Sequence, residues 1–159
     1  MKTFSSAVLF LAGLAAASPV QQQTRQSVGP YQIAEFSASK RHNSGYCDFA
    51  FDVSAPGLEG AAHCTASLDA GFSGATWLAN VYEGAGKCDD SAVTWTFFQS
   101  HAEGSGASLN VTVNGVKGLR DIPPEDISVR LNDEANPFDN DVAYAGPKAF
   151  EITEFEETE

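Results

Sequence analysis

The chain has 159 residues, with 21 acidic and 9 basic side chains and a formal net charge of −12 at pH 7. Nucleic acids and anionic membranes bind basic surfaces, so this charge argues against both as partners. The length is sufficient for one domain with a hydrophobic core.

The N-terminus has the three-part layout of a secretory signal peptide. Lys2 provides a positive start, an apolar run follows over residues 7–14, and Ala15 and Ala17 supply small residues before a cleavage site. The apolar run is too short to cross a bilayer core of about 30 Å. We therefore predict a signal peptide over residues 1–17 and a secreted, extracellular protein without a membrane span. An uncleaved N-terminal anchor is the alternative.

The hydrophobic pattern of the remaining chain has a period of two. Residues 18–30 are polar, and we predict that they form a flexible leader. Farther on, apolar and polar residues alternate, as in Cys47, Phe49 and Phe51, which share one face. The pattern predicts strands over residues 47–53, 62–68, 93–97, 109–113, 127–131 and 150–152, with weaker candidates over 31–39 and 77–82.

Turn residues separate these segments. The clearest turn is Asn114–Gly115 directly after "LNVTV", which predicts a tight hairpin. No segment after the signal peptide has a convincing helical period. The sequence thus predicts an all-β, single-domain antiparallel β-barrel or β-sandwich over residues 31–155, followed by an acidic tail over 156–159. The acidic segment 131–141 is predicted as a surface loop before the last strand.

We find no pattern of catalytic or metal-binding residues. The segment "GFSGA" resembles a nucleophile elbow, but Ala75 replaces its last glycine. His42, His63 and His101 share no metal-binding spacing, so we expect three surface histidines. The acidic segment lacks the spacing of a calcium loop. The expected protein is therefore not an enzyme and has no cofactor or metal.

Two features point to contacts with other molecules. Trp77 and Trp95 are expected in the core, with a ligand pocket as the less favoured alternative. Phe98 breaks the alternation of its strand and is the best candidate for an exposed aromatic contact. Asn110 begins the sequon "NVT" on the face opposite Leu109, so we expect it to face solvent and to be glycosylated.

The chain has three cysteines, so one must remain without a partner in the chain. In a symmetric hairpin of segments 47–53 and 62–68, Cys47 lies opposite about Ser67 and Cys64 opposite about Ala50. The two cysteines are then offset by roughly 10 Å, whereas a disulfide needs Cα atoms within about 7 Å. This register disfavours a bond between Cys47 and Cys64, and leaves Cys64–Cys88 and Cys47–Cys88 open.

In order, the segments "YQIAEFSASKRHNSGYCDFAFDV", "CTASLD", "CDDSAVTWTF", "SLNVTV" and "YAGPKAFEITEF" resemble small secreted fungal proteins of the Alternaria major-allergen type, over residues 31–155. That group includes elicitors and effectors of plant-associated fungi. The resemblance implies a β-barrel or sandwich without catalysis, linked to host recognition, to small hydrophobic or phenolic ligands and to dimerisation.

The resemblance also bears on the cysteines. Cys64 and Cys88 stand where members of the group place a disulfide flanking a loop. This pairing leaves Cys47 as an unpaired, buried, small hydrophobic residue. The cysteine that links dimers in the group has no counterpart in "QSVGPYQIAEF", so we expect a monomer or a weak homodimer without a covalent link. A host protein or a small hydrophobic ligand is the implied partner.

Overall fold

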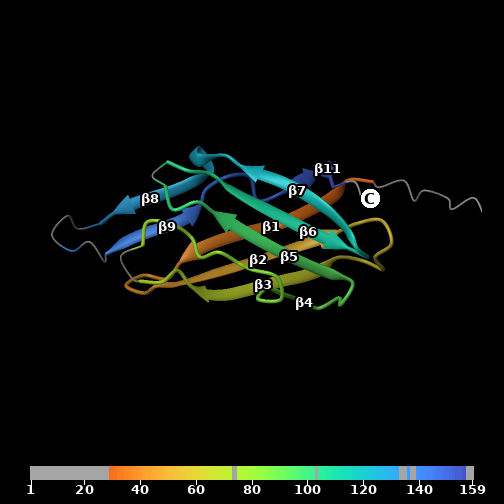
Figure 1. Ribbon diagram of the computed structural model, residues 1–159, viewed down its shortest axis with the longest axis horizontal. Coiled ribbons are helices and arrows are strands. Elements are labelled where there is room, and N and C mark those ends of the chain that lie inside the picture. The colour runs from red at the N-terminus through yellow and green to blue at the C-terminus, as the bar shows by residue number, and fades with distance from the viewer. Residues whose placement is uncertain (1–28, 73–74, 103, 133–135, 137–138, 157–159) are drawn as a thin grey trace, which may run out of the picture.

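The structure is a computed structural model that describes residues 29–72, 75–102, 104–132, 136 and 139–156. The predicted signal peptide, the leader up to residue 28 and residues 157–159 of the tail lie outside the described residues. Two antiparallel sheets pack face to face (Figure 1). The alternative between a barrel and a sandwich is therefore settled in favour of a sandwich, because the two sheets stay separate.

The larger sheet has seven strands in the order β4-β3-β2-β1-β9-β8, with β10 also paired to β1. Both β10 and β9 lie along the same edge of β1, one near each end. The strands of this sheet are β1 (Tyr31–Lys40), β2 (Tyr46–Ser54), β3 (Ala62–Asp69), β4 (Lys87–Cys88), β8 (Ile127–Leu131), β9 (Asn140–Tyr144) and β10 (Phe150–Ile152). One 3-10 turn, η1 (Pro124–Asp126), leads into β8.

The smaller sheet has four strands in the order β11-β7-β6-β5. Its strands are β5 (Val93–Gln99), β6 (Ala107–Val113), β7 (Val116–Ile122) and β11 (Glu154–Phe155). The predicted tight turn joins β6 to β7: Asn114 has φ 50° and Gly115 has φ 82°. Two successive left-handed residues are typical of a type I′ hairpin, so this prediction is confirmed.

A β-bulge divides β1. The register with β2 shifts between Ala34 and Ser37, and Glu35 adopts φ 53°. The extra residue changes which positions point inward: Tyr31 and Ile33 are buried before the bulge, and Phe36 is buried after it. The backbone N–H of Phe36 donates to the carbonyl of Lys148 (2.9 Å). This bond lies between the part of β1 that pairs with β10 and the part that pairs with β9.

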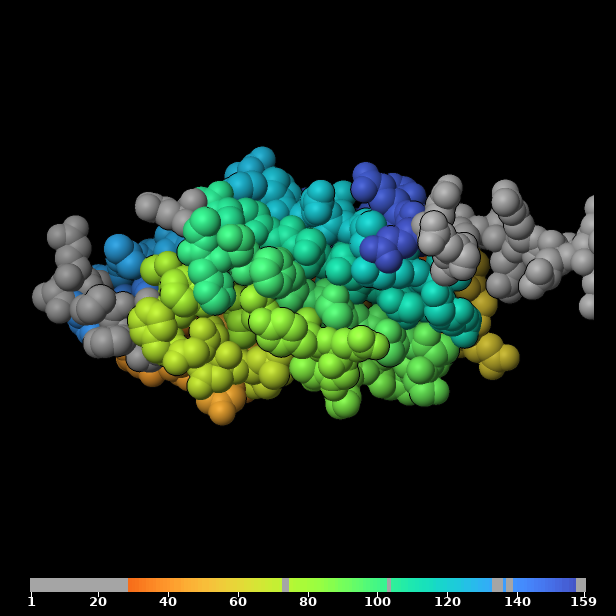
Figure 2. All heavy atoms as spheres, viewed as in Figure 1, coloured from red at the N-terminus to blue at the C-terminus, as the bar shows by residue number. Residues whose placement is uncertain are grey.

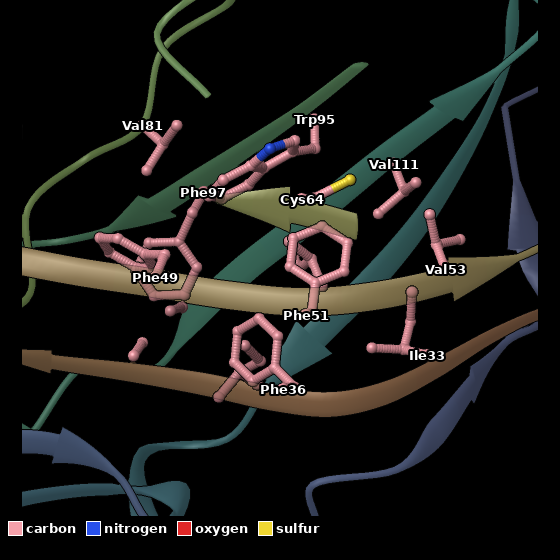
Figure 3. Packing of buried hydrophobic residues seen from close by; sticks show 14 of the residues in the cluster. Ile33, Phe36, Phe49, Phe51, Val53, Cys64, Val81, Trp95, Phe97 and Val111 are labelled. Atoms are coloured by element: carbon pink, nitrogen blue, oxygen red, sulfur yellow. The ribbon is translucent and has the colours of Figure 1, made fainter. Parts of the chain in front are cut away.

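Side chains from both sheets interdigitate in one core (Figure 3). Phe51 lies at its centre and contacts Trp95 edge to face, with ring centroids 5.1 Å apart. Phe49 contacts the rings of both Trp95 and Phe97. The period-two pattern predicted these inward positions correctly, because each strand has one face in the core.

Four details differ from the sequence-based predictions. Residues 77–82 form no strand; only Val81 makes an isolated bridge, to Phe97. The segment predicted as an acidic surface loop contains the start of β9, with Asn140 fully buried. The sequence also did not predict β7, which follows the Asn114–Gly115 turn. Finally, the register between β2 and β3 differs by one residue from the predicted register: Cys47 pairs with Leu68 rather than with Ser67. Within the described ranges, no helix is long and apolar enough to cross a membrane.

Candidate functional site

The candidate site is a groove at one end of the sandwich. Here β8 and β9 project beyond the four-stranded sheet, so loop segments rather than strands of that sheet face β8 (Figure 1). The groove has a volume of about 720 Å³. It is lined by three apolar residues of β8, by the segment before Val81 and by the turn after β5: Ile127, Val129, Leu131, Thr76, Trp77, Gln99, Ser100, His101, Ala102, Gly104, Ser105 and Pro124.

The apolar side of the groove comes from β8. Ile127, Val129 and Leu131 alternate with Ser128 and Arg130, so all three aliphatic side chains lie on the groove face. Val129 is 46% exposed and Leu131 is 59% exposed. Large aliphatic side chains gathered at an exposed strand are typical of a contact surface.

Two stacked aromatic rings form the opposite wall. The rings of Trp77 and His101 lie 4.4 Å apart, with an angle of 18° between their planes. The Trp77 indole N–H donates to the carbonyl of Ala70 (3.3 Å). Phe72 packs edge-on against the Trp77 ring, with the two ring centroids 5.5 Å apart. In Figure 2 the yellow-green atoms of residues near 70–80 and the green atoms of residues near 100 lie side by side at this end of the molecule.

Buried hydrogen bonds hold the segment that carries Trp77. The N–H of Leu78 donates to the side-chain oxygen of Gln99 (2.8 Å), and the N–H of Gln99 donates to the side-chain oxygen of Asn80 (2.7 Å). The N–H of Ala79 donates to Sγ of Cys47 (3.3 Å). The bonds to Gln99 and to Cys47 are buried and therefore shielded from water, and the bond to Asn80 is partly buried.

Cys47 therefore has a positioning role. It is the free cysteine among the described residues and is fully buried. Burial raises the pKa of its thiol, because the thiolate would lose hydration. The expected unpaired, buried residue is confirmed, and the structure adds that its sulfur accepts the hydrogen bond from Ala79.

A disulfide closes the loop that carries Trp77, one of the two rings of the aromatic wall. Cys64 in β3 is bonded to Cys88 in β4, as the resemblance implied. In the observed register Cys64 lies opposite Phe51, which is four residues from Cys47 along β2. The predicted register placed Cys64 opposite Ala50, three residues from Cys47. A one-residue change of register moves a strand's side chains to the other face. The observed register keeps Cys64 and Phe51 together in the core, and a bond between Cys47 and Cys64 remains excluded by distance.

The three histidines have different surroundings. Nδ1 of His63 lies 2.7 Å from a carboxylate oxygen of Asp52, on the outer face of β2 and β3. Nδ1 of His42 lies 3.5 Å from Asp139. His101 belongs to the groove, a location that the sequence did not reveal. In the part of the chain that the structure describes, no cluster of three or more His, Cys, Asp or Glu could hold a metal ion.

The other predicted positions lie away from the groove. Asn110 is half-buried on the outer face of the smaller sheet, where its Nδ2 donates to Oγ1 of Thr96 (3.2 Å). Its glycosylation remains a prediction. Phe98 is 53% exposed, as expected, and Trp95 is buried in the core. Trp77 instead lines the groove, and binding of a ligand there stays a prediction.

The groove joins segments far apart in the sequence, and no single motif marked it. The available signal was the alternating segment "ISVRL", but alternation does not tell whether the apolar face is covered. Comparison with known proteins adds no assignment: no family model, curated protein or solved structure matches the chain. The resemblance to the allergen-type group stays a prediction.

Proposed function

We propose that the protein is a secreted, non-enzymatic interaction protein that acts on recognition or immunity of a plant host, as fungal effectors and elicitors do. The observation that carries the proposal is the groove, whose apolar side is formed by Val129 and Leu131 on an exposed strand. Contact surfaces of this kind bind partners through buried apolar area, with polar groups at the rim.

The proposed location outside the cell rests on two features. The first is the signal-peptide pattern at the N-terminus. The second is the Cys64–Cys88 disulfide, since such bonds persist in oxidising compartments. A glycan on Asn110 fits the same route. A mass that does not change after glycosidase treatment of the secreted protein would contradict glycosylation.

Leaf infiltration tests the host-directed function. Purified protein is infiltrated into leaves of several plant species, with the urea-unfolded, reduced and alkylated protein as the control for non-specific effects. We expect cell death or induction of defence genes with the folded protein only. No response in any species, together with unaltered infection by a deletion strain, would contradict the proposal.

Binding of small hydrophobic or phenolic ligands is the second candidate function. The Trp77–His101 stack favours it, because aromatic rings that line a groove can pack against flat aromatic molecules, and the groove volume is within the usual range of about 300–1,000 Å³. Fluorescence titration with phenolics and fatty acids tests it. We expect quenching that is lost in Trp77→Phe, since Trp95 is buried. Flat titration curves would exclude this function.

A further inference from the structure

We infer that two copies of the protein associate through β8, so that the two larger sheets join into one continuous sheet across a two-fold axis at Val129. The strand ends the order β4-β3-β2-β1-β9-β8, and within the described residues no strand or bridge lies along its outer edge. An exposed edge strand with apolar side chains is a template for pairing with another strand.

The hydrogen bonds to β9 determine which backbone groups of β8 point outward. The N–H of Ala145 donates to the carbonyl of Asp126 (2.8 Å), and the N–H of Asn132 donates to the carbonyl of Asp139 (3.0 Å). In an antiparallel ladder such bonded positions recur every second residue. Ser128 and Arg130 therefore bond to β9. The intervening residues Ile127, Val129 and Leu131 direct their backbone groups toward the free edge.

These outward groups fit an antiparallel copy of the same strand. With Val129 opposite the partner's Val129, two hydrogen bonds form between these residues. Leu131 then lies opposite the partner's Ile127, and each Leu131 N–H reaches the facing Ile127 carbonyl, for two more bonds. The Ile127 N–H is not needed, because it already donates to Pro124. Each donor used in this arrangement meets an acceptor.

The side chains are also compatible with this register. On the groove face, aliphatic residues lie opposite aliphatic residues. On the other face, Ser128 lies opposite the partner's Arg130, so no like charges meet across the axis. Arg130 is already paired with Asp141 (3.1 Å) in its own chain. A two-fold axis perpendicular to the sheet keeps both groove faces on the same side and merges the two grooves into one apolar trough.

The other sheet edges are better protected. The edge strands β4 and β11 have two residues each, and β10 has three. On β5, the N–H and carbonyl of Phe97 bond to Val81, and the N–H of Gln99 bonds to Asn80. Short or covered edges do not recruit another chain. In the described part of the chain β8 is longer, with five residues, and among its outward-facing N–H groups the one of Ile127 is bonded within its own chain, to Pro124.

Symmetric crosslinking tests the register. Facing Cα atoms of a hydrogen-bonded antiparallel pair lie about 5.5 Å apart, within disulfide range. We expect Val129→Cys to form a covalent dimer on mild oxidation, seen on a non-reducing gel. The matched control is Leu131→Cys, whose two copies lie roughly 14 Å apart along the strands, and it should crosslink at least about 10-fold more slowly. Equal rates, or no crosslinking of Val129→Cys, would overturn the proposed pairing.

Analytical ultracentrifugation of the full secreted chain tests association without crosslinks. We expect the average mass to rise from one chain toward two between about 1 and 200 µM, as for a small interface. Leu131→Lys should stay monomeric over this range, while Phe98→Lys, with the same charge change at a similarly exposed residue of another strand, should associate like the wild type.

The salt dependence gives an independent criterion. The full sequence has a net charge of −12, and loss of Lys2 with the predicted signal peptide makes it −13 (8 basic and 21 acidic side chains). Salt screens repulsion between such like-charged chains. We therefore expect association to strengthen by at least about threefold between 50 and 500 mM NaCl. A wild-type protein that stays monomeric at 200 µM, or association that weakens with salt, would overturn the inference. These measurements use purified protein alone, so their outcome is independent of the host-directed function.

Discussion

Removal of the Cys64–Cys88 disulfide is expected to destabilise the protein and loosen the aromatic wall of the groove. The bond joins residues 24 positions apart, and Trp77 lies inside the loop that it closes. The loss of chain entropy that such a crosslink imposes on the unfolded state corresponds to roughly 3.5 kcal/mol at 25 °C. We expect the double variant Cys64→Ala/Cys88→Ala to lose at least this free energy of unfolding, because Cys64 is also buried.

Urea unfolding followed by tryptophan fluorescence measures this loss. The control is Cys47→Ala, which truncates another fully buried thiol and removes one hydrogen bond without removing a crosslink. We expect the control to lose about 1–3 kcal/mol, from the lost contacts and the unpaired N–H of Ala79. A double variant no less stable than this control would refute the argument that the closed loop stabilises the fold.

Three further predictions concern the turn, the free cysteine and the response to acid. Gly115→Ala should lower the free energy of unfolding by about 1–2 kcal/mol, since φ 82° is strained for alanine; unchanged urea stability would contradict the type I′ geometry. The thiol of Cys47 should resist a water-soluble thiol reagent in the native protein and react after unfolding, so rapid native labelling would disprove its burial. Hydrogen bonds from Arg41 hold the pKa of Asp48 below its usual range. This contribution is present above the Asp pKa of the unfolded chain and is lost as the pH falls through the lower folded pKa, so Arg41→Ala should move acid unfolding to higher pH. The same acid midpoint in both proteins would rule out this contribution.

The core of the fold was predictable from local pattern. Alternating residues such as Phe49 and Phe51 identified the strands and their inward faces, because each strand buries one side. The Asn114–Gly115 turn was predictable because few residues adopt two successive left-handed conformations. Such signals lie within a few residues of one another, so one sequence is sufficient to read them.

The features that were missed depend on residues distant in sequence. The bulge at Glu35 changes the inward positions within β1, so no single alternation describes that strand. The β2–β3 register depends on the geometry of the connecting turn, and it differed by one residue from symmetric pairing. The groove was not predictable because the exposure of Leu131 depends on where the other sheet ends.

The most direct test of the central claim is a comparison of two single variants in leaves. Leu131→Lys places a charge in the groove, and Phe98→Lys places the same charge on the outer face of the other sheet, at residues 59% and 53% exposed. Circular dichroism and urea unfolding first establish that both variants are folded. If the protein acts through the groove, Leu131→Lys should need at least about 10-fold more protein for the same leaf response, while Phe98→Lys should match the wild type. Full activity of Leu131→Lys, or an equal loss in both variants, would contradict the assignment of function to the groove.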